Sequence, residues 1–162
     1  MVVRSARRRK TVEARVVDGV IRVRVPARMS KADERVHVER LVARLERRRV
    51  AATIDLDGRA AALARRYDLP RPRSVAWADN QEKRWGSCTP SQGTVRLSSR
   101  LAALPPWVVD AVIVHELAHL VEPGHTPAFW ALVNRYPRAE RALGYLMALG
   151  LAGGTADPGG SG

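Results

Sequence analysis

The stretch that decides the fold reads Pro105-Pro-Trp-Val-Val-Asp-Ala-Val-Ile-Val-His-Glu-Leu-Ala-His119, and it is followed by Leu-Val-Glu-Pro-Gly-His125. Proline is well tolerated in the first turn of a helix, and the residues after the two prolines are almost all apolar. We therefore predict a buried helix from Trp107 to about Val121. Pro123 and Gly124 are expected to stop it, because neither residue favours a continuing helix.

Two histidines and a glutamate share this predicted helix. Residues four apart lie on one face of a helix, so His115 and His119 can bind the same metal ion. Glu116 lies beside them and can reach a metal-bound water without being a ligand. Zinc lowers the pKa of such a water towards ~7, and a carboxylate can then take its proton during attack on a carbonyl or phosphoryl centre. We predict one Zn²⁺ per chain, with Glu116 as the catalytic general base.

A third metal ligand has to come from outside the two helical turns. Catalytic zinc commonly uses three protein ligands and leaves one position for water. The break at Pro123-Gly124 has no other evident purpose, and glycine allows a sharp reversal that returns His125 to the ion. Glu122 and Glu140 are the alternatives. Three of the four histidines in the chain fall within eleven residues, which also favours His125.

Other segments show the periodicity of strands or helices. They are a β-hairpin over Thr11–Val25 with Asp18-Gly19 as its turn, a helix over Lys31–Arg49 with Ser30 as its N-cap, a helix over Arg59–Tyr67, strands over Ser74–Ala78 and Thr94–Ser98, a helix from Pro127 to between Asn134 and Tyr136 with Thr126 as its cap, and a helix over Ala139–Leu149.

The length of 162 residues suits one domain with its own hydrophobic core. We predict a single domain over residues 1–152, which begins with a basic arm at residues 1–10. Residues 153–162 are rich in Gly and contain Pro and Ser, so we predict a disordered tail there.

The net charge of +12 is concentrated in the first part of the chain. The first 50 residues carry 16 Lys or Arg and 6 Asp or Glu, a net of +10, whereas the other 112 residues carry 12 and 10, a net of +2. This asymmetry favours an anionic partner such as nucleic acid or a nucleotide. A solvated, Arg-rich surface explains the same count equally well.

The cysteine content and the lengths of the apolar segments indicate in which cellular compartment the protein is expected. Cys88 is the single cysteine, so an intramolecular disulfide is excluded, which fits a reducing environment. The basic start is not followed by the apolar segment of a secretory signal, and no uncharged apolar run is long enough to span a bilayer. We expect a cytoplasmic protein with no membrane partner.

The chain also carries an ordered set of motifs: Arg84-Trp-Gly-Ser-Cys88, the strand Thr94–Ser98, the segment from His115 to His119, and His125-Thr-Pro-Ala-Phe-Trp130. With these it resembles the YgjP-like metallopeptidase family, which is related to the SprT-like and WLM-type zincins. The resemblance implies an α+β, zincin-like single domain, with a small, mostly antiparallel sheet beside the zinc-binding helix and an N-terminal hairpin and helix.

The same resemblance implies roles for particular residues. It gives His115, His119 and His125 as metal ligands, Glu116 as general base, and a peptide or protein as substrate. Nucleotide hydrolysis has also been proposed for the family. One departure is Ser98, because family members often carry Asn near the end of this strand; Ser can still form a hydrogen bond there.

Residues near the predicted site have alternative interpretations. Arg84 can steady an oxyanion, bind an anionic substrate or form a structural ion pair. Trp85 and Cys88 are expected to pack the core beneath their loop, and Phe129 with Trp130 to pack the loop of the third ligand against the zinc helix. The strand Thr94–Ser98 is a candidate edge for an extended substrate, or else an internal strand.

These observations predict a zinc-dependent metallohydrolase, in the first place a metallopeptidase. One alternative is a metal-dependent nucleotide or phosphoanhydride hydrolase, which the basic N-terminal half suits. Another is a zinc-containing nucleic-acid-binding protein. Against the last, structural zinc normally has four protein ligands, and the chain has no second cysteine to complete such a set.

Overall fold

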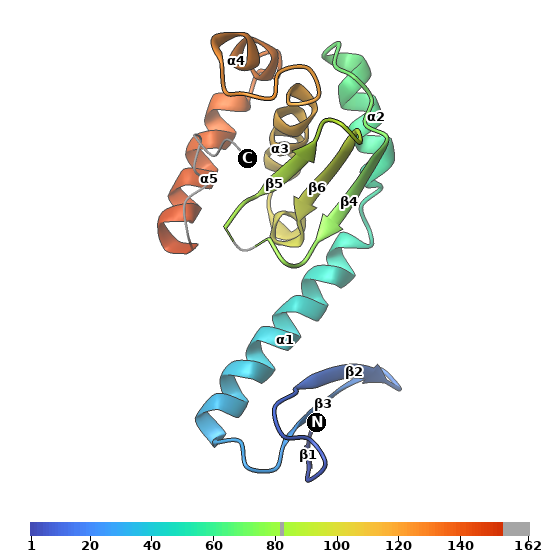
Figure 1. The fold of residues 1–162 in the computed structure, drawn as a ribbon, viewed down its shortest axis with the longest axis vertical. Coiled ribbons are helices and arrows are strands. Elements are labelled where there is room, and N and C mark those ends of the chain that lie inside the picture. The colour runs from blue at the N-terminus through green and yellow to red at the C-terminus, as the bar shows by residue number, and fades with distance from the viewer. Residues whose placement is uncertain (82, 154–162) are drawn as a thin grey trace. The chain divides into compact units, whose positions relative to one another are not determined.

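The computed structural model describes residues 1–81 and 83–153, which fall into two compact units, Met1–Arg49 and Val50–Gly162 (Figure 1). From residue 154 on, the predicted disordered tail lies outside the described residues. The element order is mixed, with strands and helices in both units, and the prediction of an α+β fold is confirmed.

The first unit contains the sheet β1-β3-β2, formed by β1 (Val2–Ser5), β2 (Glu13–Val17) and β3 (Val20–Pro26). β2 and β3 are antiparallel and form the predicted hairpin. Its two turn residues, Asp18 and Gly19, have φ angles of 51° and 74°, the left-handed conformation that a two-residue type I′ turn requires. β1 runs parallel to β3, where the sequence analysis placed only a basic arm.

The helix α1 (Lys31–Ala51) follows this sheet in the chain. Ser30 is its N-cap as predicted, since the Ser30 Oγ accepts a hydrogen bond of 3.1 Å from the backbone N–H of Asp33. The inward side of β3 carries Val23 and Val25, which are fully buried.

The second unit contains the sheet β4-β6-β5, formed by β4 (Ser74–Ala78), β5 (Gly86–Thr89) and β6 (Thr94–Ser98). β4 is parallel to β6 and β5 is antiparallel to it, so the sheet is mixed rather than mostly antiparallel. β6 is the central strand, so of the two interpretations of Thr94–Ser98 the internal strand is confirmed and the substrate-binding edge is wrong. β5 is an edge strand instead.

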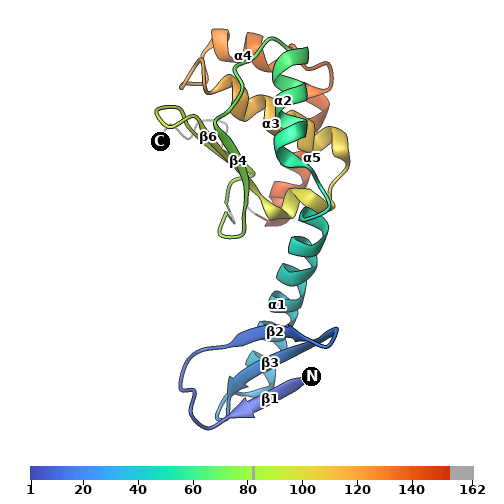
Figure 2. The same cartoon turned by 90° about the vertical axis from the view of Figure 1, so that its right-hand side faces the viewer.

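The helices of the second unit are α2 (Leu56–Arg66), the 3-10 helix η1 (Ser99–Ala103), α3 (Pro106–Ala118), α4 (Pro127–Val133) and α5 (Ala139–Gly153). α2 and α3 pack against one face of the sheet (Figure 2). Val95 and Leu97 of β6 and Ile113 and Leu117 of α3 are buried to 1% exposure or less, and they form the centre of the core between these layers.

α3 is buried along most of its length because its neighbours cover several of its sides. It packs on α2, α4 and α5 as well as on the sheet. Asp110, the one charged residue before the histidines, forms an ion pair with Arg59 of α2. None of the helices over the described residues is long and apolar enough to cross a membrane.

Candidate metal centre

The three histidines predicted as metal ligands meet at the end of α3. His115 lies in the last turn of the helix, His119 is its C-cap and His125 lies in the loop before α4. One ring nitrogen of each can be chosen so that all three lie within 4.8 Å of one another. Over residues 1–81 and 83–153 no carboxylate joins this group, so Glu122 and Glu140 are not part of it.

The chain returns to the helix through a short loop rather than through a glycine kink. α3 ends at Ala118, three residues earlier than predicted, and Glu122 N–H donates to the Ala118 carbonyl at 2.9 Å. Gly124 does not have a positive φ, and a Cβ placed there would meet only Thr126, at 3.7 Å. The expectation that the conformational freedom of Gly124 brings His125 back to the other two histidines is therefore wrong. Thr126 then caps α4 as predicted, accepting from Phe129 N–H at 3.2 Å.

Two aromatic side chains of α4 hold the imidazole rings. Phe129 is fully buried, stacks on His119 with ring centroids 4.3 Å apart, and meets His115 and His125 edge-on at 4.9 Å each. Trp130 stacks on His125 with centroids 5.9 Å apart. The predicted packing of this loop against α3 is thus present, and it restricts where each imidazole can point.

The protonation of the histidines suits a metal. Nδ1 of His119 lies 3.1 Å from the Glu122 carbonyl, which can only accept, so Nδ1 carries the proton and the lone pair of Nε2 is left for an ion. Burial lowers the pKa of His119, and burial with the two neighbouring histidines lowers the pKa of His115 to about 3. Neutral imidazoles are the form that binds zinc, so this donor set fits the ion.

Glu116 is buried between α3 and β5, with 5% of its surface exposed. Burial raises its pKa to about 8, while the positive charge of Arg84 acts in the opposite direction. A Cβ built on Gly86 of β5 would lie 2.7 Å from Glu116 Oε1. Glycine at this position therefore lets the edge strand approach the carboxyl group closely. A carboxyl group beside three histidines, with its charge disfavoured by burial, is suited to proton transfer.

This close approach leads to a testable prediction. Gly86→Ala should lower kcat/KM for peptide substrates on the order of 10²-fold, because the added methyl group displaces the Glu116 carboxyl group from its position. The matched control is Gly144→Ala on α5, where a Cβ meets nothing within 4 Å. The control should keep activity and gain about 0.5–1 kcal/mol of stability from the helix. Equal activities of both variants in steady-state assays contradict this account of Gly86.

Ser98 and Arg100 hold the loop that enters β5. Ser98 Oγ donates to the Gln81 carbonyl at 3.2 Å, and Ser98 N–H donates to the Trp85 carbonyl at 2.8 Å. The Arg100 guanidinium donates to Ser98 Oγ and to the Gln81 carbonyl, both at 3.2 Å, and lies 4.4 Å over the Trp85 ring. Ser98 thus has the hydrogen-bonding role expected of it. Arg100 was missed, because no sequence pattern marks it.

Arg84, Trp85 and Cys88 line the same cleft as the histidines. Arg84 is exposed and forms no ion pair with another residue among residues 1–81 and 83–153. Trp85 and Cys88 pack against the core as predicted. Burial, with a smaller effect of Glu116, raises the pKa of the Cys88 thiol to about 11, and over the described residues Cys88 is not part of the histidine group.

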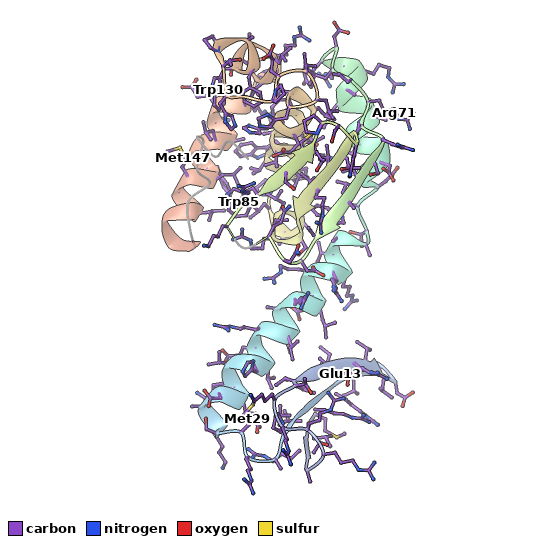
Figure 3. All side chains as sticks on the ribbon, viewed as in Figure 1. Glu13, Met29, Arg71, Trp85, Trp130 and Met147 are labelled. Atoms are coloured by element: carbon purple, nitrogen blue, oxygen red, sulfur yellow. The ribbon has the colours of Figure 1, made fainter. Side chains whose placement is uncertain are left out.

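The cleft has a volume of about 800 Å³ and lies between β5, α3, α4 and α5. Figure 3 labels Trp85 and Trp130, two of its lining residues. A sheet whose edge strand flanks a helix with the sequence His115-Glu-x-x-His119 defines the zincin class of metalloproteins. The chain belongs to the YgjP-like metallopeptidase domain family, whose sequence model matches residues 21–143. Membership in a metallopeptidase family implies a metal, usually zinc.

A solved structure shares the fold. The crystal structure of the metallopeptidase zymogen of Pyrococcus abyssi abylysin superposes with a TM-score of 0.53 at 20% sequence identity. The match covers 61% of this chain and 97% of abylysin. No curated protein matches the chain.

Proposed function

We propose that this protein is a zinc-dependent peptidase in which His115, His119 and His125 hold one ion and Glu116 is the general base. The observation that carries the proposal is the group of three imidazole nitrogens within 4.8 Å, beside a buried carboxyl group in one cleft. Three protein ligands leave a fourth position for water or substrate, as in catalytic rather than structural zinc sites.

The residues divide the chemistry between them. A bound zinc ion supplies Lewis acidity, which polarises the scissile carbonyl and makes a water acidic near neutral pH. Glu116 takes the proton of the attacking water and passes it to the leaving amine. Arg84, which is exposed on the cleft, is the cation that would stabilise the negative charge developing on the carbonyl oxygen. With an ion held by His115, His119 and His125, Glu116 would be favoured in its ionised form, which is the form that takes a proton.

The edge strand β5 gives the substrate its orientation. Among the described residues β5 pairs with β6 alone, so its other edge is where an extended peptide would pair. Gly86 of β5 lies against Glu116, so a peptide paired with this edge passes close to the base. In this proposal β5, and not β6, is the edge that pairs with substrate.

A nucleotide hydrolase that uses the same residues is the second candidate. The observation that favours it is the presence of two exposed cations, Lys83 and Arg84, on the wall of the cleft. Contact of the basic N-terminal unit with nucleic acid stays a prediction.

A direct comparison separates the two candidates. Zinc-loaded protein is incubated with a mixture of peptides and, separately, with the four nucleoside triphosphates, and products are identified by mass spectrometry. We expect peptide fragments that are absent with Glu116→Gln, and intact triphosphates. Turnover of a triphosphate that is lost in Glu116→Gln, with no peptide cleaved, contradicts the peptidase and supports the second candidate.

A further inference from the structure

The cleft continues from the histidines into a region with an apolar floor. On α5 the apolar residues that line it follow the helical spacing i, i+3, i+4, i+7, and they are Ala139, Ala142, Leu143 and Leu146. Glu140, in the first turn of α5, also lines the cleft but is exposed. The face that α5 turns toward the cleft is therefore apolar from Ala142 to Leu146.

The opposite wall of this region belongs to α3. Ala111 lies one helical turn before His115, and Val112 lies one turn before Glu116. One turn is about 5.4 Å along a helix, and an extended peptide rises about 3.3 Å per residue, so these two side chains lie within about two residues of a scissile bond held beside His115 and Glu116. The apolar region thus begins close to the proposed metal ligand and base.

Burial differs between the polar and apolar residues of the cleft. Away from the histidines and Glu116, the charged and amide side chains that line it are exposed: Lys83, Arg84, Asn134 and Glu140. The apolar residues Ala111, Val112, Ala142 and Leu146 are at most 8% exposed. A side chain that enters between α3 and α5 therefore leaves water and meets apolar surface at these four residues.

Small side chains make the space. Ala111, Ala139 and Ala142 present only a methyl group at the wall of the cavity, whose volume is about 800 Å³. This volume lies in the range of pockets that bind small organic ligands, 300–1,000 Å³ as an order of magnitude. The space is thus large enough for an aromatic or branched side chain as well as a short stretch of peptide backbone.

We infer that the region between α3 and α5 is a specificity pocket, and that the protein selects peptides with a large apolar side chain next to the scissile bond. This inference rests on the proposed peptidase function. Burying apolar groups in a fitted pocket discriminates by about 10- to 200-fold, so Leu or Phe at this position should exceed Ala on the order of 100-fold in kcat/KM.

The test uses peptides that differ at one position, with Ala, Leu, Phe or Glu beside the cleaved bond. Leu143→Trp narrows the pocket from its half-buried wall and should lower the Phe-to-Ala ratio of kcat/KM about tenfold. Met147→Trp is the matched control on the same helix, since Met147 is 52% exposed and does not line the cleft (Figure 3). The Phe-to-Ala ratio of kcat/KM for Met147→Trp should equal that of the wild type.

A second variant that narrows the pocket is needed because the indole ring introduced by Leu143→Trp can turn into solvent and leave the pocket unchanged. Ala111→Leu adds three carbons from the opposite wall and should change the ratio in the same direction. An unchanged ratio in both variants, or a wild-type preference for Ala or Glu, overturns the specificity pocket while leaving the peptidase intact.

A binding measurement separates this inference from the proposed function. The Glu116→Gln protein is titrated with the same peptides, and the fluorescence of Trp85 and Trp130, which line the cleft, reports binding. We expect affinity to rise from Ala to Leu to Phe and to fall with Glu. If no peptide is ever cleaved but this order holds, the pocket stands and the peptidase fails; equal affinities overturn the pocket.

Discussion

Glu116→Gln is expected to lower kcat for peptide hydrolysis by about 10³-fold while one zinc ion per chain stays bound. Glutamine has nearly the same shape as glutamate but cannot take a proton, and general base catalysis contributes about 10²- to 10⁴-fold. Zinc is retained because Glu116 lies beside the three histidines and is outside their group. Elemental analysis and steady-state kinetics on the same preparation measure both quantities.

The stability of the variant provides the control for folding. Burial raises the pKa of Glu116 from its ordinary 4.5 to about 8. In metal-free protein the unfolded chain loses this proton first, so the wild type loses stability as pH rises from about 4.5 to about 8. Glutamine does not titrate, so above pH 8 the metal-free variant should unfold at a higher temperature than the wild type, and at pH 4 the two should be similar.

Two outcomes contradict the role of Glu116. If the variant keeps wild-type kcat, another group is the base. If it loses zinc while thermal unfolding in chelator shows an intact fold, Glu116 contributes to metal binding, and the loss of activity no longer reports proton transfer.

His125→Ala is expected to weaken zinc binding by at least about 100-fold and to abolish peptide hydrolysis. Even groups that only orient a ligand contribute about 10- to 100-fold to metal affinity, and His125 is placed to be a ligand itself. The variant should fold, because Phe129 and Thr126 still fix the start of α4. Zinc retained after competition with a chelator of known affinity measures the change.

Glu140→Ala is the matched variant for the third ligand. Glu140 lines the same cleft at the start of α5 but is exposed and does not join the histidine group among the described residues. The Glu140→Ala protein should therefore bind zinc as tightly as the wild type. The reverse result, zinc lost in Glu140→Ala and kept in His125→Ala, replaces His125 by Glu140 as the third ligand.

The candidate site could be predicted from the sequence because its geometry is local. The turn of an α-helix places His115 and His119 on one face, and His125 follows His119 by only six positions. A chain reversal over so few residues has few solutions, and Pro123 excludes a continuing helix. The reason given for the reversal was wrong in its detail, because Gly124 adopts a backbone conformation that any residue can take.

What could not be predicted depends on pairing between distant segments. β6 shows the alternation of a half-buried strand at Val95 and Leu97, but alternation does not tell which neighbours a strand has. β5 is four residues long and begins with Gly86, and β1 carries no alternating pattern, so neither was predicted. The sequence alone therefore left two interpretations of β6, an edge strand or an internal one.

Side-chain contacts between separate loops could not be predicted from the sequence either. Arg100 reaches the Gln81 carbonyl and the Trp85 ring from η1, and these contacts depend on how β6 and the loop before β5 lie together. The apolar face of α5 could be predicted as helical, but its position opposite Ala111 follows only from the packing of α5 on α3.

A zinc titration of metal-free protein, followed by peptide cleavage, tests the central claim most directly. Zinc is added in steps to the wild type and to His125→Ala at a protein concentration well above the dissociation constant. We predict that wild-type cleavage rises linearly and reaches its plateau at one zinc per chain, while His125→Ala stays inactive over the same range. Cleavage that is independent of zinc, or no cleavage of any peptide at full loading, contradicts the assignment as a zinc peptidase.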